Sequence, residues 1–122
     1  MGGRVMERPW AAASMTVDDP RKLLKSKILS LAGVERRESR WGKDPAYFVD
    51  GREFVHFHGR RELDIRLTKR LQGIGRSRLQ QDSRIGFRNG RSEWITFTVG
   101  AEGDLEFALS LIKLAWEGNR KT

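Results

Sequence analysis

The 122-residue chain has no cysteine, two histidines, three prolines and one tyrosine. Without thiols the protein cannot form a disulfide, a thiolate metal site or a cysteine nucleophile, and it suits a reducing cytoplasm. It also lacks an apolar run approaching the roughly 18–20 residues of a membrane span. Residues 1–14 have no continuous apolar stretch of the kind a secretory signal needs. We therefore expect a cytoplasmic protein that does not enter a membrane.

The length fits a single domain. A domain of about 100 residues can bury a core without disulfides or metals, so no cofactor is required for folding. Residues 1–17 show no structural period and are predicted to form a flexible N-terminal tail. We expect one α+β domain over residues 18–119, followed by a C-terminal tail at 120–122.

Helical spacing predicts one helix at each end of this domain. The sequence Asp18-Asp19-Pro20 is typical of a helix start, and Gly33 of a helix end. The second predicted helix runs from Asp104 to Glu117. The expected buried faces are formed by Leu24, Ile28 and Leu31 in the first helix and by Leu105, Ala108, Leu109, Ile112 and Trp116 in the second.

Between the helices, alternating apolar residues predict about five antiparallel strands. Asp50-Gly51 and Asn89-Gly90 favour tight hairpin turns. In the strand Trp94–Val99 the apolar face is Ile95, Phe97 and Val99. We expect an antiparallel sheet with the N- and C-terminal helices packed on one face.

The segment after the central hairpin is less regular. Thr68 would cap a short helical turn, but Gly73 and Gly75 interrupt it. Residues 73–84 are therefore predicted to be a basic loop.

The central hairpin, Glu53–Leu67, carries both histidines of the protein. A turn at Gly59-Arg60-Arg61 pairs Phe57 with Leu63 on the apolar face, and this match selects the register. The same register pairs His56 with Asp64 and His58 with Glu62. The predicted polar face carries Phe54, His56, His58, Glu62, Asp64 and Arg66.

Two histidines at positions i and i+2 of a strand lie roughly 6–7 Å apart and point the same way. His56, His58 and Asp64 could therefore bind one metal ion. The same residues could transfer protons near neutral pH, with Arg66 steadying an anionic substrate. A solvated sheet face decorated with ordinary cross-strand pairs remains open as well.

Positive charge is concentrated in residues 69–91, where seven Lys and Arg residues face only Asp82, within a chain of net charge +8. Such a cluster attracts nucleic acid or another anionic ligand. The candidate ligand-binding residues are Arg76, Arg78, Arg88 and Trp94, and Trp94 could stack on a base or ring. A non-catalytic binding domain is the leading hypothesis, a metal-dependent or acid–base enzyme using His56, His58 and Asp64 is the alternative, and a structural subunit is a third reading.

Two stretches resemble a known family. Residues 51–59, GREFVHFHG, followed by residues 63–68, LDIRLT, are similar to the luciferase domain family, and so are the Trp94 strand and the closing helix. The resemblance implies that the family's His-x-His and Asp positions correspond to His56, His58 and Asp64, with Arg66 beside them. It implies neither light emission nor an oxygenase. The order helix, sheet, helix also resembles the MmcQ/YjbR-like double-wing domains, some of which are thought to bind DNA.

Overall fold

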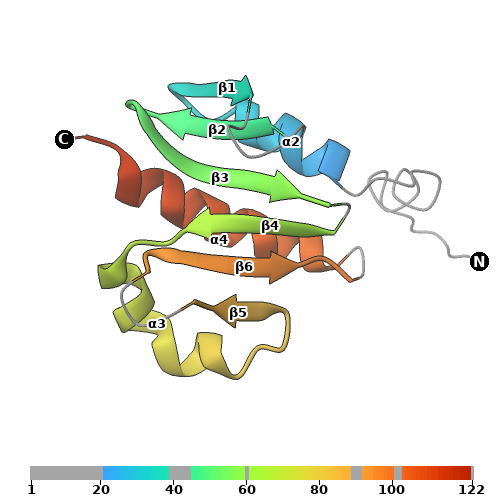
Figure 1. The fold of residues 1–122 in the computed structure, drawn as a ribbon, viewed down its shortest axis with the longest axis vertical. Coiled ribbons are helices and arrows are strands. Elements are labelled where there is room, and N and C mark those ends of the chain that lie inside the picture. The colour runs from blue at the N-terminus through green and yellow to red at the C-terminus, as the bar shows by residue number, and fades with distance from the viewer. Residues whose placement is uncertain (1–20, 39–44, 60, 89–91, 101–102, 122) are drawn as a thin grey trace, which may run out of the picture.

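The computed structural model describes residues 21–38, 45–59, 61–88, 92–100 and 103–121 (Figure 1). The predicted start at Asp18-Asp19-Pro20 and the Asn89-Gly90 turn lie outside these residues. The elements are, in chain order, α2 (Arg21–Leu29), β1 (Val34–Glu38), β2 (Pro45–Val49), β3 (Arg52–His58), β4 (Glu62–Arg66), α3 (Lys69–Gln80), β5 (Ile85–Phe87), β6 (Trp94–Thr98) and α4 (Asp104–Asn119).

The six strands form one antiparallel sheet in the order β1-β2-β3-β4-β6-β5. Helices α2 and α4 pack together against one face, and α3 lies beside β5 (Figure 1). The predicted α+β architecture is thus confirmed, with one strand more than the expected five. Of the helices in the described ranges, none is long and apolar enough to cross a membrane.

The core lies between the sheet and the two helices. Cross-strand pairs such as Val55–Ile65 and Phe57–Leu63 point toward it, and both pairs are buried. Each fully buried aliphatic or aromatic side chain contributes about 1.5–3 kcal/mol through removal from water. The helices supply Leu24, Ile28, Leu105, Ala108, Leu111, Ile112 and Ala115.

Two features of the hairpins agree with the sequence. Asp50 and Gly51 both have positive φ, 51° and 80°, as the tight turn between β2 and β3 requires. The β3–β4 register is the predicted one, with His56 opposite Asp64 and His58 opposite Glu62. The polar side chains of the hairpin therefore share the face of the sheet opposite the core.

Phe54 departs from the prediction. We expected it on the polar face, but it is 0% exposed and belongs to the core cluster. The pairing of β2 with β3 shifts at this point, because Tyr47 faces Val55 whereas Phe48 faces Glu53. Phe54 is thus the extra residue of a β-bulge, which interrupts the strict alternation of faces.

The predicted basic loop at residues 73–84 is also wrong, because α3 continues through Gly73 and Gly75 to Gln80. Thr68 caps the helix as expected, its hydroxyl accepting a hydrogen bond from the Leu71 N–H. A Cβ at Gly118 of α4 would lie 3.0 Å from the Leu71 side chain, so α3 approaches α4 closely there. Tertiary packing therefore outweighs the local cost of the glycines, which is about 1 kcal/mol each.

Candidate functional site

The site is centred on Asp64 of β4, a carboxylate that is 2% exposed. Asp64 lies between His56 of β3 and Thr96 of β6, its partners on the two neighbouring strands. The His56 Nε2–H donates to Oδ2 over 2.8 Å, and the Thr96 hydroxyl donates to Oδ1 over 2.8 Å. One row of side chains across three strands thus supplies two hydrogen bonds to a buried anion.

Two further donors complete the surroundings of Asp64. The His58 Nε2–H donates to Oδ1 over 3.1 Å, and the Arg88 Nη2–H donates to Oδ2 over 2.5 Å. Arg88 follows the short edge strand β5, in which Gly86 faces Thr96 and carries no side chain. The arginine can therefore extend over β6 to Asp64. Both carboxylate oxygens accept two hydrogen bonds each, which offsets the cost of burying the charge.

His56 lies between two carboxylates. Its Nδ1 is 3.0 Å from Glu53 Oε2 while its Nε2 faces Asp64. The bulge at Phe54 brings Glu53 onto this face, although residues three apart in a regular strand point to opposite faces. Only an imidazolium donates from both ring nitrogens. Burial alone would lower the pKa of His56, but the hydrogen bonds and charges of Asp64 and Glu53 raise it above its ordinary value of 6.5.

His58 has a different environment. Its side chain is 44% exposed, and its Nδ1 lies 3.3 Å from Glu62 Oε1 on the neighbouring strand. Its Nε2 is held by Asp64, so the ring is oriented by the same buried carboxylate as His56. Of the two imidazoles, His58 is therefore the one that an external molecule can reach.

Asp64 carries a negative charge throughout the neutral range. Burial would raise the pKa of Asp64, but hydrogen bonds from His56, Thr96 and His58 lower it far below its ordinary value of 3.8. The carboxylates of Glu53, Asp64 and Glu62 then face the Arg88 guanidinium and the His56 imidazolium. Among the described groups in contact with the histidines, these three carboxylates outnumber the cations, which favours a neutral or cationic molecule over an anion at this point.

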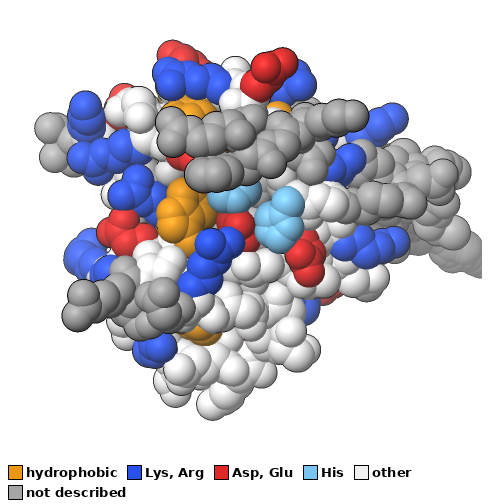
Figure 2. Space-filling model, in the orientation of Figure 1, with side chains coloured by type: hydrophobic (Ala, Val, Ile, Leu, Met, Phe, Trp, Pro, Cys, Tyr) orange, Lys and Arg blue, Asp and Glu red, His pale blue; other side chains and the backbone are white. Residues whose placement is uncertain are grey.

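The indole ring of Trp94 lies beside the histidines. The Trp94 and His56 ring centroids are 5.0 Å apart, and the two histidine rings are 6.1 Å apart. Figure 2 shows the histidine side chains near the centre of the viewed face of the molecule, with acidic, basic and hydrophobic side chains around them. The indole is partly exposed and offers a flat apolar surface beside the ionisable groups.

Some of the predicted ligand-binding and catalytic residues lie at the Asp64 site, and others lie elsewhere. Arg88 and Trp94 join His56, His58 and Asp64 at the site, as described above. Arg66 instead pairs with Glu93 over 2.7 Å, so its charge is already compensated. Arg76 lies over the Phe87 ring at 4.8 Å, and Arg78 is exposed on α3.

Metal binding by His56, His58 and Asp64 stays a prediction. The three side chains meet, but both Nε2 atoms donate to Asp64. Within the described ranges no group of three His, Asp or Glu side chains is arranged to hold a metal ion. A metal would have to displace the protons of both imidazoles from these hydrogen bonds.

Sequence reasoning missed two members of the site. Glu53 reaches His56 only because of the bulge, for which the sequence carries no strong signal. Thr96 lies on the predicted polar side of its strand, but its contact with Asp64 depends on the pairing of β4 with β6. The alternation of Trp94, Thr96 and Thr98 places Thr96 on the polar face. The sequence does not show that this strand pairs with the strand of Asp64, so the contact could not be predicted.

The model of the luciferase domain family matches residues 51–115. This segment is more than half of the 122-residue chain and contains Asp64, both histidines, Arg88 and Trp94. No curated protein and no solved structure matches the chain, so the likeness to double-wing domains also stays a prediction. The match covers the whole segment from the turn before β3 into α4, and the chain therefore belongs to the luciferase domain family.

Proposed function

We propose that the protein is an acid–base enzyme in which His58 exchanges a proton with a small neutral or cationic substrate on the open face of the sheet. The observation that carries the proposal is the contact between the buried Asp64 carboxylate and the His58 Nε2–H, at 3.1 Å. A carboxylate behind an imidazole fixes the ring and its tautomer and stabilises the imidazolium that forms on proton uptake. Nδ1, which lies 3.3 Å from Glu62 Oε1, is then the basic atom, and the Glu62 carboxylate stabilises the proton that it takes up.

The other residues have supporting roles in this proposal. His56 and Arg88 compensate the charge of Asp64 and hold it in place. Trp94 supplies an apolar surface for the substrate. The carboxylates beside the histidines, Glu53, Asp64 and Glu62, disfavour an anionic substrate, so neutral and cationic compounds are screened.

The test is a screen of uncharged and cationic carbonyl compounds and esters for hydrolysis or for deuterium uptake from D2O, followed by NMR. We expect His58→Gln to reduce the rate about 100-fold or more, since general acid–base catalysis contributes roughly that factor. Glu117→Gln, which removes an exposed carboxylate on α4, is the control and should retain the rate. An activity that survives His58→Gln unchanged would remove the proposal.

A second candidate function, binding of nucleic acid or another anionic ligand, is favoured by α3. Lys69, Arg70 and Arg78 are exposed on this helix, and none makes an ion pair within the part of the chain that the structure describes. Arg70 and Arg78 lie about 80° apart around the helix axis, so both can face one polyanion.

Filter binding of single- and double-stranded DNA and of RNA across a salt series tests this candidate. If Arg70 and Arg78 each contact a phosphate, the double variant Arg70→Gln/Arg78→Gln should reduce the salt slope by about 2. Lys113→Gln on α4 removes a similar exposed charge and serves as the control. A slope that is equal in the double variant and the wild type would exclude α3 as the contact surface.

A further inference from the structure

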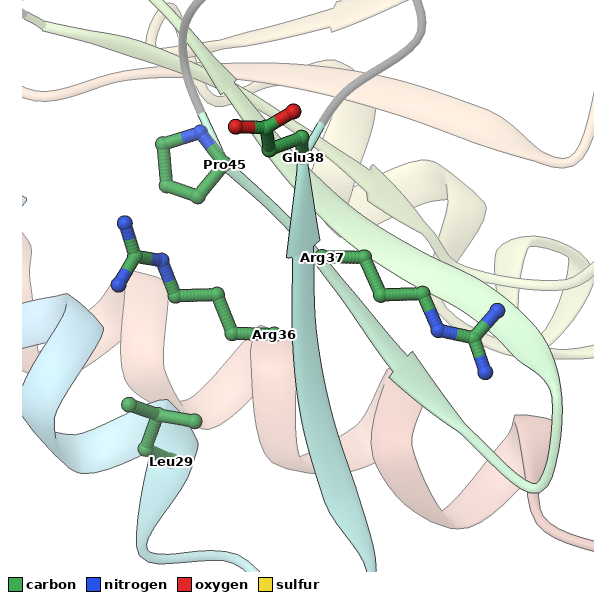
Figure 3. Close-up of a pocket in the computed structure, with 5 residues that line it drawn as sticks. All are labelled: Leu29, Arg36, Arg37, Glu38 and Pro45. Atoms are coloured by element: carbon green, nitrogen blue, oxygen red, sulfur yellow. The ribbon is translucent and has the colours of Figure 1, made fainter.

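A hollow lies at the β1 end of the sheet, away from the Asp64 site. This cavity of about 320 Å³ is lined by Leu29 of α2, by Arg36, Arg37 and Glu38 of β1, and by Pro45 of β2 (Figure 3). Its volume is near the lower end of the range of small-molecule sites, about 300–1,000 Å³. It therefore suits a ligand of few atoms.

Two side chains of opposite charge, Arg36 and Glu38, line this cavity, and both are exposed. Arg36 and Glu38 are two residues apart on β1, so their side chains leave the sheet on the same face. Over the described residues, neither side chain makes an ion pair or hydrogen bond. Arg37 differs, because it points to the other side of β1, pairs with Glu35 over 3.0 Å and lies over the Phe48 ring (Figure 3).

A buried hydroxyl lies on the same side as Arg36. Tyr47 is the cross-strand partner of Arg36 and is 0% exposed. Its hydroxyl has no hydrogen-bond partner in the described part of the chain, which is uncommon for a buried polar group. Burial raises the pKa of Tyr47, while the positive charge of Arg36 acts against this increase.

We propose that this cavity binds a small apolar amino acid, with its carboxylate on Arg36, its ammonium group on Glu38 and its side chain against Leu29 and Pro45. A zwitterion compensates the charges of Arg36 and Glu38 at once. A phosphate or other polyanion would be repelled by Glu38. An amine without a carboxylate would meet the uncompensated charge of Arg36.

The test compares three ligands of similar shape, namely leucine, isovalerate and isoamylamine. Each is titrated to concentrations on the order of 10 mM, where a ligand with a millimolar Kd occupies most of the sites. The readout is the NMR shift of the Leu29 methyl groups and of the Arg36 and Glu38 amides. We expect leucine to bind at least about tenfold more tightly than either half-analogue, since each lost charge contact weakens binding by about that factor.

Variants then separate the two ends of the ligand. Arg36→Gln should weaken leucine about tenfold and leave isoamylamine unaffected or improved, whereas Glu38→Gln should bring leucine and isovalerate to similar affinities. Lys113→Gln on α4, which removes a positive charge elsewhere on the surface, should leave binding unchanged.

Two results would overturn the proposal. One is equal binding of leucine and isovalerate to the wild type, which would mean that Glu38 contributes nothing. The other is leucine binding that is the same in Arg36→Gln and in the wild type, including the absence of binding in both. Neither result bears on His58, so this proposal and the acid–base proposal stand or fall separately.

Discussion

Two clusters of charged side chains differ in which charge lies at the centre. The Asp64 cluster consists of Asp64, His56, His58, Thr96 and Arg88, and the Arg84 cluster consists of Arg84, Asp82 and Asp104. At Asp64, a buried carboxylate is surrounded by cations and hydrogen-bond donors. At Arg84, a guanidinium donates to both oxygens of Asp82 over 2.6 and 2.9 Å and to Asp104 over 2.7 Å. The Arg84 guanidinium also lies over the ring of Phe107 at 4.6 Å.

The two clusters differ in what their members can do near neutral pH. Hydrogen bonds from Arg84 lower the pKa of Asp82 to about 2, and those to Asp82 and Asp104 raise the pKa of Arg84 above its ordinary value. None of these changes brings a titration into the neutral range. The Asp64 cluster contains two imidazoles, one of them exposed. We infer that the Arg84 cluster joins the segment before β5 to the start of α4, whereas the Asp64 cluster can exchange protons.

The largest effect is expected from Asp64→Asn. The amide cannot compensate the His56 imidazolium and Arg88, so both charges lose their buried partner. Breaking a buried charge cluster in this way costs about 3–5 kcal/mol. Urea unfolding at neutral pH measures this loss, and Asp82→Asn, at the partly exposed Arg84 cluster, should cost less. A variant at Asp64 as stable as the wild type would show that the cluster is not a stabilising centre.

Much of this fold could be predicted because one face of each strand is buried. Shifting the β3–β4 register by one residue would turn Val55 and Phe57 toward solvent, so a single register matches the apolar faces. That register also gives the pairs His56–Asp64 and His58–Glu62. The same argument failed at Phe54, because a bulge adds a residue without changing the local composition.

The rest of the site depends on contacts between distant segments. Arg88 reaches Asp64 only because β5 and β6 lie beside β4, an order that alternation along a strand does not contain. The helix α3 also depends on a contact between distant segments. Packing of Leu71 against Gly118 offsets the locally unfavourable Gly73 and Gly75. The Arg88–Asp64 contact and the length of α3 thus follow from long-range packing, which local sequence patterns do not contain.

The next largest effect is expected from Arg84→Met. Removing a guanidinium that holds two carboxylates should cost about 1–2 kcal/mol after allowance for its partial exposure. Because the pKa of its partner Asp82 is lowered to about 2, the loss should be the same across the neutral range. Thermal or urea unfolding at two pH values on either side of neutrality checks this. A loss that varies strongly between them would contradict the contrast with Asp64.

A smaller and pH-dependent effect is expected from His56→Gln. The raised pKa of His56 means that the folded state favours the imidazolium. Its contribution is fully present below the ordinary pKa of 6.5 and is lost as pH rises through the higher folded pKa. The difference in free energy of unfolding between wild type and variant should therefore shrink on the alkaline side. A constant difference across this window would mean that His56 stabilises the fold only by packing.

The smallest effect is expected from Glu53→Gln, which keeps the shape of the bulge and removes one charge. Glu53 ranks after Asp64 among the groups that raise the pKa of His56, so the variant should lower that pKa without returning it to the value of an isolated imidazole. An NMR titration of the imidazole C–H signals measures the change. Glu62→Gln is the matched control, because Glu62 lies beside His58. If both variants lower the pKa of His56 equally, the bulge has no specific role, and the two histidines then respond to the total charge of the face instead of to separate partners.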